Sequence, residues 1–407
     1  MAKSNMRKSD DLVEIYQKYF PEEFEFFENR LRNGYKKDGN DCRFFLGARD
    51  NYLNIYYMGQ SIAKIEIPYK GDSRRKTNYS VAKYIYYGDL EGEDANTEDK
   101  EKKQSYVPLE WEEYKDAFDA IIDNARKHAS GKRKGAKQKT VHREKICQQN
   151  IINYNNADQK SDWYYIDMEY IDAQDPCGRV DMVAIRKSKN NNGKQEVALV
   201  ELKVGTDAYG CSIANYGELK ERIYDKLEKN LYISEFRKYK YGSGILSHIA
   251  DYLRYLNDDR YKKQLRKELV LMLKVHNAFG VLQGDNLSLA TLTEDDFEDK
   301  PTIYILSYTH DPLVSEKKKN VNELKRTMYK YLFKDKPMGT SDRALEKMLD
   351  PIQVRGFIDK KMDFQKFLES EEIELDCIQN VNGNDYTFKF KFWDPDKHPN
   401  RAWDCLG

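Results

Sequence analysis

Three charged residues interrupt two apolar, β-branched segments of the chain. Asp181 lies in GRVDMVAIRK, and Glu201 and Lys203 lie in EVALVELKVG. Side chains alternate between the two faces of a strand, so Glu201 and Lys203 should project side by side, about 7 Å apart. Both faces of this segment are apolar at its start, which is typical of a central strand covered on both sides. The sequence therefore predicts charges where a sheet is hardest to solvate.

Two carboxylates at one end of a sheet repel each other, and a divalent cation with oxygen ligands offsets that repulsion. Mg²⁺ is usually held by one or two carboxylates together with waters and substrate phosphates. A neighbouring lysine can orient or help to deprotonate a water, or hold a scissile phosphate. Asp181, Glu201 and Lys203 are the residue types that metal-assisted phosphodiester hydrolysis requires. The hairpin register must bring Asp181 opposite or diagonal to Glu201, and the sequence does not fix that register.

The elements around these residues predict a mixed α/β (α+β) fold in which helices flank a mixed β-sheet. The asparagine–glycine cluster NNNGK should form a hairpin turn between the two charged strands. The expected order is a helix at 141–156, strands at 163–172, 178–187 and 196–205, helices at 242–257 and 262–280, and a strand at 302–309.

Asp181, followed twenty positions later by Glu201-Leu202-Lys203, resembles the PD-(D/E)XK nuclease superfamily. The resemblance covers roughly residues 140–310. The core of that family runs helix, three strands, helix and strand, which is the order expected here. The resemblance implies a restriction-endonuclease-like core of the type αβββα(α)β.

The resemblance also implies roles for individual residues. Asp181 and Glu201 correspond to the Mg²⁺ ligands, with Mn²⁺ as a substitute, and the backbone carbonyl of Leu202 corresponds to a further ligand. Lys203 corresponds to the catalytic lysine. The chain departs from the family pattern at Val180, which stands where the family name has a proline.

Several residues outside the motif are weaker candidates. Family members often add a metal-binding acid from the first helix, here Glu144, with Gln148 as a weaker alternative; an exposed helix glutamate is the plainer interpretation. Glu169 shares a strand face with Asp167 and is a tentative catalytic residue. The alternative interpretation is an acidic residue at the edge of a hairpin without a catalytic role. His248 borders the apolar face of its helix, where a structural histidine competes with a phosphate or ligand-shell contact.

The segments on either side divide the chain further. Segment 126–145 holds nine Lys/Arg and one Glu, which is typical of a solvated linker and also of an arm that grips phosphates. The residues of such an arm are Lys132, Arg133, Lys134, Lys137 and Lys139. The expected domains are an N-terminal module at 1–125, a basic linker at 126–139, the core at 140–310 and a mostly helical region at 311–407. The N-terminal module should contain helices at 11–32 and 107–128 and a β-meander at 42–69. The last region should contain a late strand at 386–393.

Composition limits the partners and the compartment. The formal net charge of the 407 residues is zero, so nucleic acid could be bound only by segregated basic residues. The cysteines are far apart without a C-x-x-C pair, which favours a reducing compartment. The N-terminus lacks an apolar signal region, and no apolar run is long enough to span a membrane. We therefore expect a cytoplasmic protein without a membrane partner.

The function expected from these features is a Mg²⁺-dependent phosphodiesterase, an endonuclease acting on DNA. Phage defence, restriction and repair are settings that suit such a nuclease by analogy alone. Two alternatives stay open: a non-catalytic nucleic-acid-binding protein on a nuclease-like fold, and an RNA-cleaving effector regulated by the N-terminal module. The sequence also leaves open a homodimer or an activating partner.

Overall fold

The chain forms a mixed α+β structure, as expected from the sequence. The computed structural model describes residues 9–37, 39–49, 52–67, 77–88, 106–129, 143–157, 161–171, 179–204, 252, 259–308, 352–356, 372–379, 385–393, 404 and 406. The chain divides into two compact units that are discontinuous in sequence. Unit 1 comprises Met1–Met168 and Arg266–Asp296, and unit 2 comprises Glu169–Leu265 and Phe297–Gly407. The four consecutive domains expected from the sequence stay a prediction.

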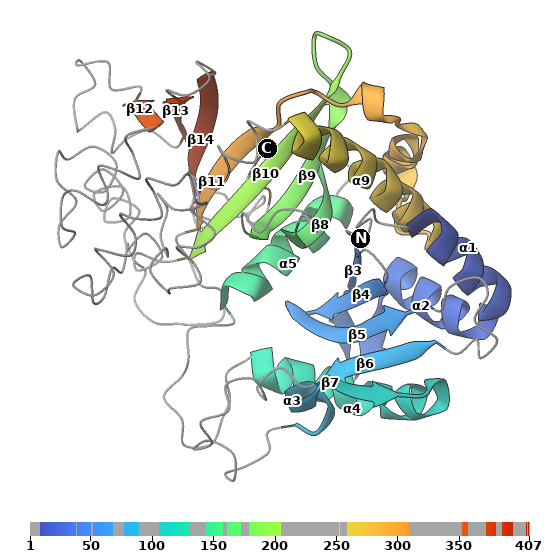
Figure 1. Ribbon diagram of the computed structural model, residues 1–407. Helices are drawn as coiled ribbons and strands as arrows, with labels where there is room; N and C mark the ends of the chain where they lie inside the picture. The colour runs from blue at the N-terminus through green and yellow to red at the C-terminus, as the bar shows by residue number, and fades with distance from the viewer. Residues whose placement is uncertain are drawn as a thin grey trace, which may run out of the picture. The chain divides into compact units, whose positions relative to one another are not determined.

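Unit 1 contains a five-stranded antiparallel meander (Figure 1). Its strands, in spatial and sequence order, are β3 (Phe45–Ala48), β4 (Tyr52–Tyr57), β5 (Gln60–Glu66), β6 (Asn78–Ala82) and β7 (Tyr106–Leu109). A small hairpin, β1 (Tyr35–Lys37) and β2 (Asn40–Cys42), precedes it. The tight turn between β4 and β5 uses Met58 and Gly59, both with positive φ, as two-residue hairpins require. The meander expected at 42–69 is confirmed and continues through two further strands.

The helix expected at 11–32 is wrong, because two helices occupy this segment. They are α1 (Ser9–Tyr19) and α2 (Pro21–Asn33). Proline lacks the backbone N–H that an uninterrupted helix needs, but its fixed φ suits the first position of a new helix. Pro21 occupies the start of α2, and Phe20 before it has a non-helical backbone conformation (φ −136°, ψ 54°).

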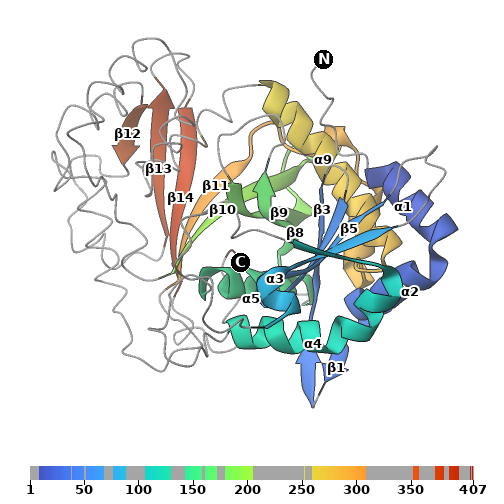
Figure 2. The ribbon, with the colours of Figure 1, turned by 60° about the horizontal axis from the view of Figure 1, so that its bottom comes forward.

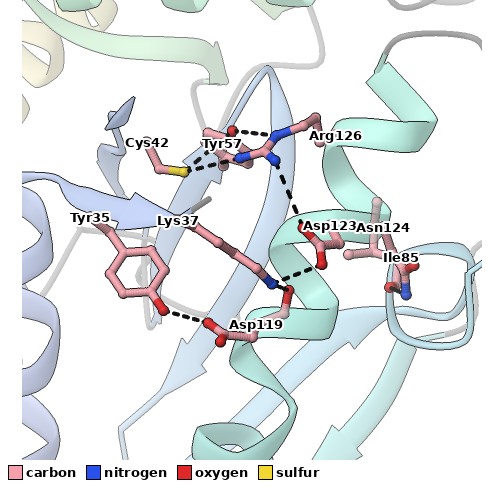
Figure 3. Close-up of polar contacts among 9 residues, drawn as sticks. All are labelled: Tyr35, Lys37, Cys42, Tyr57, Ile85, Asp119, Asp123, Asn124 and Arg126. Carbon is pink, nitrogen blue, oxygen red and sulfur yellow. Dashed lines mark hydrogen bonds and ion pairs between the residues drawn. The ribbon is translucent and has the colours of Figure 1, made fainter. Parts of the chain in front are cut away.

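Helix α4 (Trp111–Ala129) packs an apolar face into unit 1 and presents polar contacts along its other side. Its buried residues recur at helical spacing and include Tyr114, Phe118, Ile121, Ile122 and Ala125. Lys37 of β1 donates hydrogen bonds to the carbonyl oxygen of Asp119 at 2.6 Å and to Asp123 at 2.8 Å, as Figure 3 shows. Arg126 donates to the Tyr57 hydroxyl. The short helix α3 (Lys83–Tyr86) lies before this helix in the chain.

The remaining elements of unit 1 fall close to their expected positions. Helix α5 (Arg143–Ala157) and helix α9 (Asp259–Ala278, whose first residues belong to unit 2) are confirmed within a few residues. Strand β8 (Trp163–Ile171) follows α5 in the chain. The short helices η4 (Gly284–Thr291) and η5 (Glu294–Asp296) follow α9. No described helix is both long and apolar enough to cross a membrane.

A seven-stranded sheet has the order β12-β13-β14-β11-β10-β9-β8 (Figures 1 and 2), and all its strands except β8 lie entirely in unit 2. Strands β10, β11 and β14 run parallel, whereas the pairs β9–β10, β12–β13 and β13–β14 are antiparallel. The bounds are β9 (Arg179–Lys189), β10 (Gln195–Val204), β11 (Thr302–Tyr308), β12 (Ile352–Gly356), β13 (Glu372–Gln379) and β14 (Asp385–Trp393). The expected strands at 178–187, 196–205, 302–309 and 386–393 are confirmed.

After residue 311, which the sequence predicts to be mostly helical with a late strand, the structure describes three strands, β12, β13 and β14. Most of that region lies outside the described residues, so its expected helices stay a prediction. β14 pairs in parallel with β11, so the sheet continues past residue 310. The missed signal is clearest in β13, EIELDCIQ, where acidic and apolar residues alternate strictly from Glu372 to Cys377. Such a period of two is that of a strand with unlike faces.

The β9–β10 hairpin carries the three charges singled out from the sequence. Its turn closes through a hydrogen bond from the Gly193 amide to the Asn190 carbonyl at 2.9 Å, so the predicted hairpin turn is confirmed. A register shift separates Gln195 from Val197, and beyond it the ladder is regular as far as the Val200–Met182 pair. The regular part of this ladder determines where the charged residues meet.

Candidate functional site

The β9–β10 register places Asp181 and Glu201 next to the last regular pair of the hairpin. The regular ladder ends with Leu199 paired to Val183 and Val200 paired to Met182, and one further step of the same register would align Glu201 with Asp181. Facing residues of an antiparallel pair share one face of the sheet. The half-buried Asp181 also accepts a hydrogen bond, through Oδ2, from the backbone N–H of Leu202 at 2.8 Å.

Glu201 and Lys203 form an ion pair inside unit 2. Lys203 Nζ lies 2.5 Å from Glu201 Oε1, and the two residues are only 6% and 1% exposed. The hydroxyl of Tyr252, also buried, donates a hydrogen bond to the other oxygen of Glu201. Both oxygens of this carboxylate therefore have donors within the protein. A cation bound to Glu201 would compete with these two donors.

Sequence reasoning missed Tyr252. It stands four residues after His248 in the segment that was expected to be a helix. Residues at that spacing lie on the same face of a helix. Attention to that face could have identified the tyrosine, although nothing in the local sequence indicates that it reaches Glu201.

The neighbouring strand β11 adds a hydroxyl to the same face of the sheet. β10 and β11 run in parallel register, with Glu201 beside Ile305 and Lys203 beside Ser307. Lys203 and Ser307 are each the second-last residue of their strand. Ser307 is fully buried, and sequence reasoning missed it as well. The carboxyl ends of parallel strands are where open α/β sheets commonly bind ligands.

The carboxylates of Asp181 and Glu201 fit a magnesium ion that keeps most of its waters. Mg²⁺ commonly binds one or two protein carboxylates and completes its shell with water and phosphate oxygens. Among the described residues there is no group of three or more His, Cys, Asp or Glu that could hold a metal. A Mg²⁺ ion at this site stays a prediction, with Asp181 and Glu201 as the residues that would hold it. The role of the Leu202 carbonyl stays a prediction.

The weaker acidic candidates lie on other elements, and their roles stay predictions. Glu169 is half-buried in β8 with φ of 57°, a left-handed conformation that interrupts the two-face alternation assumed for it. Its catalytic role stays a prediction. Glu144, in the first turn of α5, belongs to unit 1, and its role as a ligand stays a prediction.

Other candidates are buried for structural reasons or are not described. Asp167, on the strand of Glu169, is fully buried and accepts two hydrogen bonds from Arg49 at 2.7 and 2.8 Å within unit 1. Gln148 is buried in α5, where its Oε1 has no hydrogen-bond partner among the described residues. The candidates His248, Lys132, Arg133, Lys134, Lys137 and Lys139 lie outside the described residues.

Comparisons of the chain with protein-family models, with curated proteins and with solved structures found no match. The resemblance to the PD-(D/E)XK nucleases rests on the charged residues and on the order of the elements. The described elements run in the order α5, β8, β9, β10, α9, β11. The helix expected at 242–257 lies outside the described residues except for Tyr252, so the nuclease-like core stays a prediction.

Proposed function

We propose that unit 2 carries a Mg²⁺-dependent nuclease site that hydrolyses phosphodiester bonds, with DNA as the favoured substrate. The observation that supports this proposal is the convergence of Asp181, Glu201 and Lys203 on one face at the end of the β9–β10 hairpin. Asp181 and Glu201 would hold the Mg²⁺. The bound ion would supply Lewis acidity toward a phosphoryl oxygen.

The chain's own residues have distinct parts in such a reaction. Hydrolysis forms a bond from a water oxygen to phosphorus and breaks the bridging P–O bond, and the leaving alkoxide gains the proton that the water loses. Lys203, held by Glu201, places positive charge where negative charge develops on the phosphoryl oxygens. Tyr252 fixes the second oxygen of Glu201, and the Leu202 amide fixes Asp181. This positioning limits the reorganisation needed during the reaction.

The test compares cleavage of supercoiled plasmid, single-stranded DNA and RNA by the full chain with Mg²⁺ or with EDTA. Lys203→Ala should abolish cleavage. Arg186→Ala is the matched control, because Arg186 pairs with Glu196 at 3.3 Å on the same hairpin, away from the cluster. Cleavage that needs metal, is lost in Lys203→Ala and persists in Arg186→Ala supports the proposal. Cleavage that survives in Lys203→Ala contradicts it.

The choice of substrate is decided by the same experiment. A supercoiled plasmid has no free ends, so its cleavage supports an endonuclease that acts on DNA. Cleavage of RNA alone supports the RNA-cleaving effector instead. Because the net charge is zero, binding should depend on local basic residues and fall steeply with salt. Phage defence, restriction and repair stay proposals that rest on analogy.

One observation favours the non-catalytic binding protein as a second candidate. Glu201 is already satisfied on both oxygens by Lys203 and Tyr252, so the charge cluster is stable in its surroundings without a cation. In that case no substrate should be cleaved, and salt-sensitive binding of nucleic acid should be the same in wild type and Lys203→Ala.

A further inference from the structure

Ser307 carries a buried hydroxyl for which the described part of the chain offers no hydrogen-bond partner. Its exposure is 0%, and Oγ contacts no donor or acceptor among the residues that the structure describes. The apolar neighbours Ile303, Ile305 and Leu306 in the same strand are also fully buried. Serine therefore interrupts a strand that otherwise consists of core residues.

This arrangement has a free-energy cost that calls for an explanation. A buried hydroxyl that has lost water and gained no partner destabilises the folded protein, and alanine would fill nearly the same space without that cost. Buried polar groups without partners are few in native proteins, and a catalytic role is one recognised reason for them. Packing alone therefore does not explain a serine at position 307.

The register explains what the hydroxyl could contact. Ser307 is paired with Lys203 across the parallel β10–β11 ladder, at the carboxyl ends of both strands. Side chains of paired residues lie on the same face, and neighbouring strands are about 5 Å apart. Ser307 and Lys203 are thus adjacent residues on one face, and a hydroxyl and an ammonium group both suit an anionic oxygen. Glu201 lies two residues before Lys203 on that face.

We propose that the Ser307 hydroxyl donates a hydrogen bond to a non-bridging oxygen of the scissile phosphate, beside Lys203. This inference rests on the proposed nuclease function and adds a second phosphate-binding group to the site. The hydroxyl lacks a partner in the free protein because its partner is the substrate. Ser307 therefore lowers the stability of the free protein and contributes to phosphate binding.

The test is a pair of hydroxyl-removing variants on one strand. Ser307→Ala should raise the Tm of the free protein, because an unsatisfied group is removed, and should lower kcat/KM for DNA about tenfold to a hundredfold. Thr302→Val is the control, because the Thr302 hydroxyl donates to Glu196 at 3.0 Å at the other end of β11. The Tm of Thr302→Val should be equal to or lower than that of the wild type, and its kcat/KM should equal the wild-type value.

Opposite results overturn the proposal. A lower Tm for Ser307→Ala means that the hydroxyl has a partner in the free protein, and an unchanged kcat/KM means that it does not contact the substrate. If the wild-type chain cleaves nothing, the proposed function fails, and equilibrium binding of a short DNA duplex in EDTA then decides the role of Ser307. Weaker binding by Ser307→Ala keeps it as a phosphate-binding group. Equal binding by the two proteins, or none by either, overturns it.

Discussion

Replacing Lys203 with methionine should strongly destabilise the chain, because it leaves the Glu201 carboxylate buried without its cation. The side chains of Lys203 and Glu201 are only 8% and 2% exposed. Removing one partner of a buried pair typically costs about 3–5 kcal/mol, a large part of the roughly 5–15 kcal/mol that stabilises a folded protein. The Tyr252 hydrogen bond to Glu201 remains in the variant and limits the loss.

The matched comparison is Arg186→Met on the same hairpin. Arg186 pairs with Glu196 at 3.3 Å, but its side chain is 41% exposed. Exposed pairs contribute about 0–1 kcal/mol, so this variant should unfold at nearly the wild-type urea concentration. The two variants exchange similar side chains and differ mainly in the burial of the pair.

Urea denaturation measures both effects, and the slope m reports whether the unfolded states remain comparable. With m unchanged, Lys203→Met should shift the midpoint several times further than Arg186→Met. Equal shifts for the two variants would refute the reasoning, since they would mean that the Glu201–Lys203 pair is solvated in solution. The same data show whether loss of cleavage in a Lys203 variant reflects chemistry or unfolding.

Two further predictions concern unit 1. Burial lowers the pKa of His276 from 6.5 to about 4. Between these pH values the folded state keeps the imidazole neutral, whereas the unfolded state takes up a proton. The free energy of unfolding should therefore fall by up to about 3 kcal/mol as the pH drops from about 6.5 to 4. Urea midpoints across that range should vary less in His276→Gln, and parallel curves would contradict the assignment. Gly59→Ala should cost more than about 2 kcal/mol, because Gly59 has φ of 72° and an added Cβ would lie 2.5 Å from Lys145 Cβ. Gly193→Ala, with φ of 74° and no atom within 4 Å of the added Cβ, should cost about 1 kcal/mol in thermal unfolding and serves as its control.

The parts of the fold that the sequence predicted are those with strong local signals. Strand β10 has two apolar faces and ends in charged residues, and the Asn-Gly turn before it determines a hairpin. Helix α9 repeats apolar residues at helical spacing. Such periodicities depend only on neighbouring residues, so no knowledge of the tertiary structure is needed to interpret them. The convergence of Glu201 and Lys203 was predictable for the same reason.

The parts that the sequence did not predict depend on contacts between distant segments. The pairing of β14 with β11 joins residues that are about 85 positions apart, and nothing local in either strand specifies its partner. Tyr252 reaches Glu201 from 51 residues away. Ser307 was not predicted as a functional residue, because a single serine in an apolar strand does not indicate a site unless its pairing with Lys203 is known. Functional residues of this kind are recognised by their neighbours in space.

The energetics of the cluster also separate its two candidate roles. Replacing a buried ion pair with apolar residues of similar size is often neutral or stabilising, by about 1–4 kcal/mol. If Glu201→Leu/Lys203→Met is at least as stable as wild type, the charges do not serve stability, and their presence beside Asp181 and the unpartnered Ser307 is explained by chemistry. A double variant that remains as unstable as Lys203→Met alone would instead assign the pair a structural role and favour the non-catalytic binding protein.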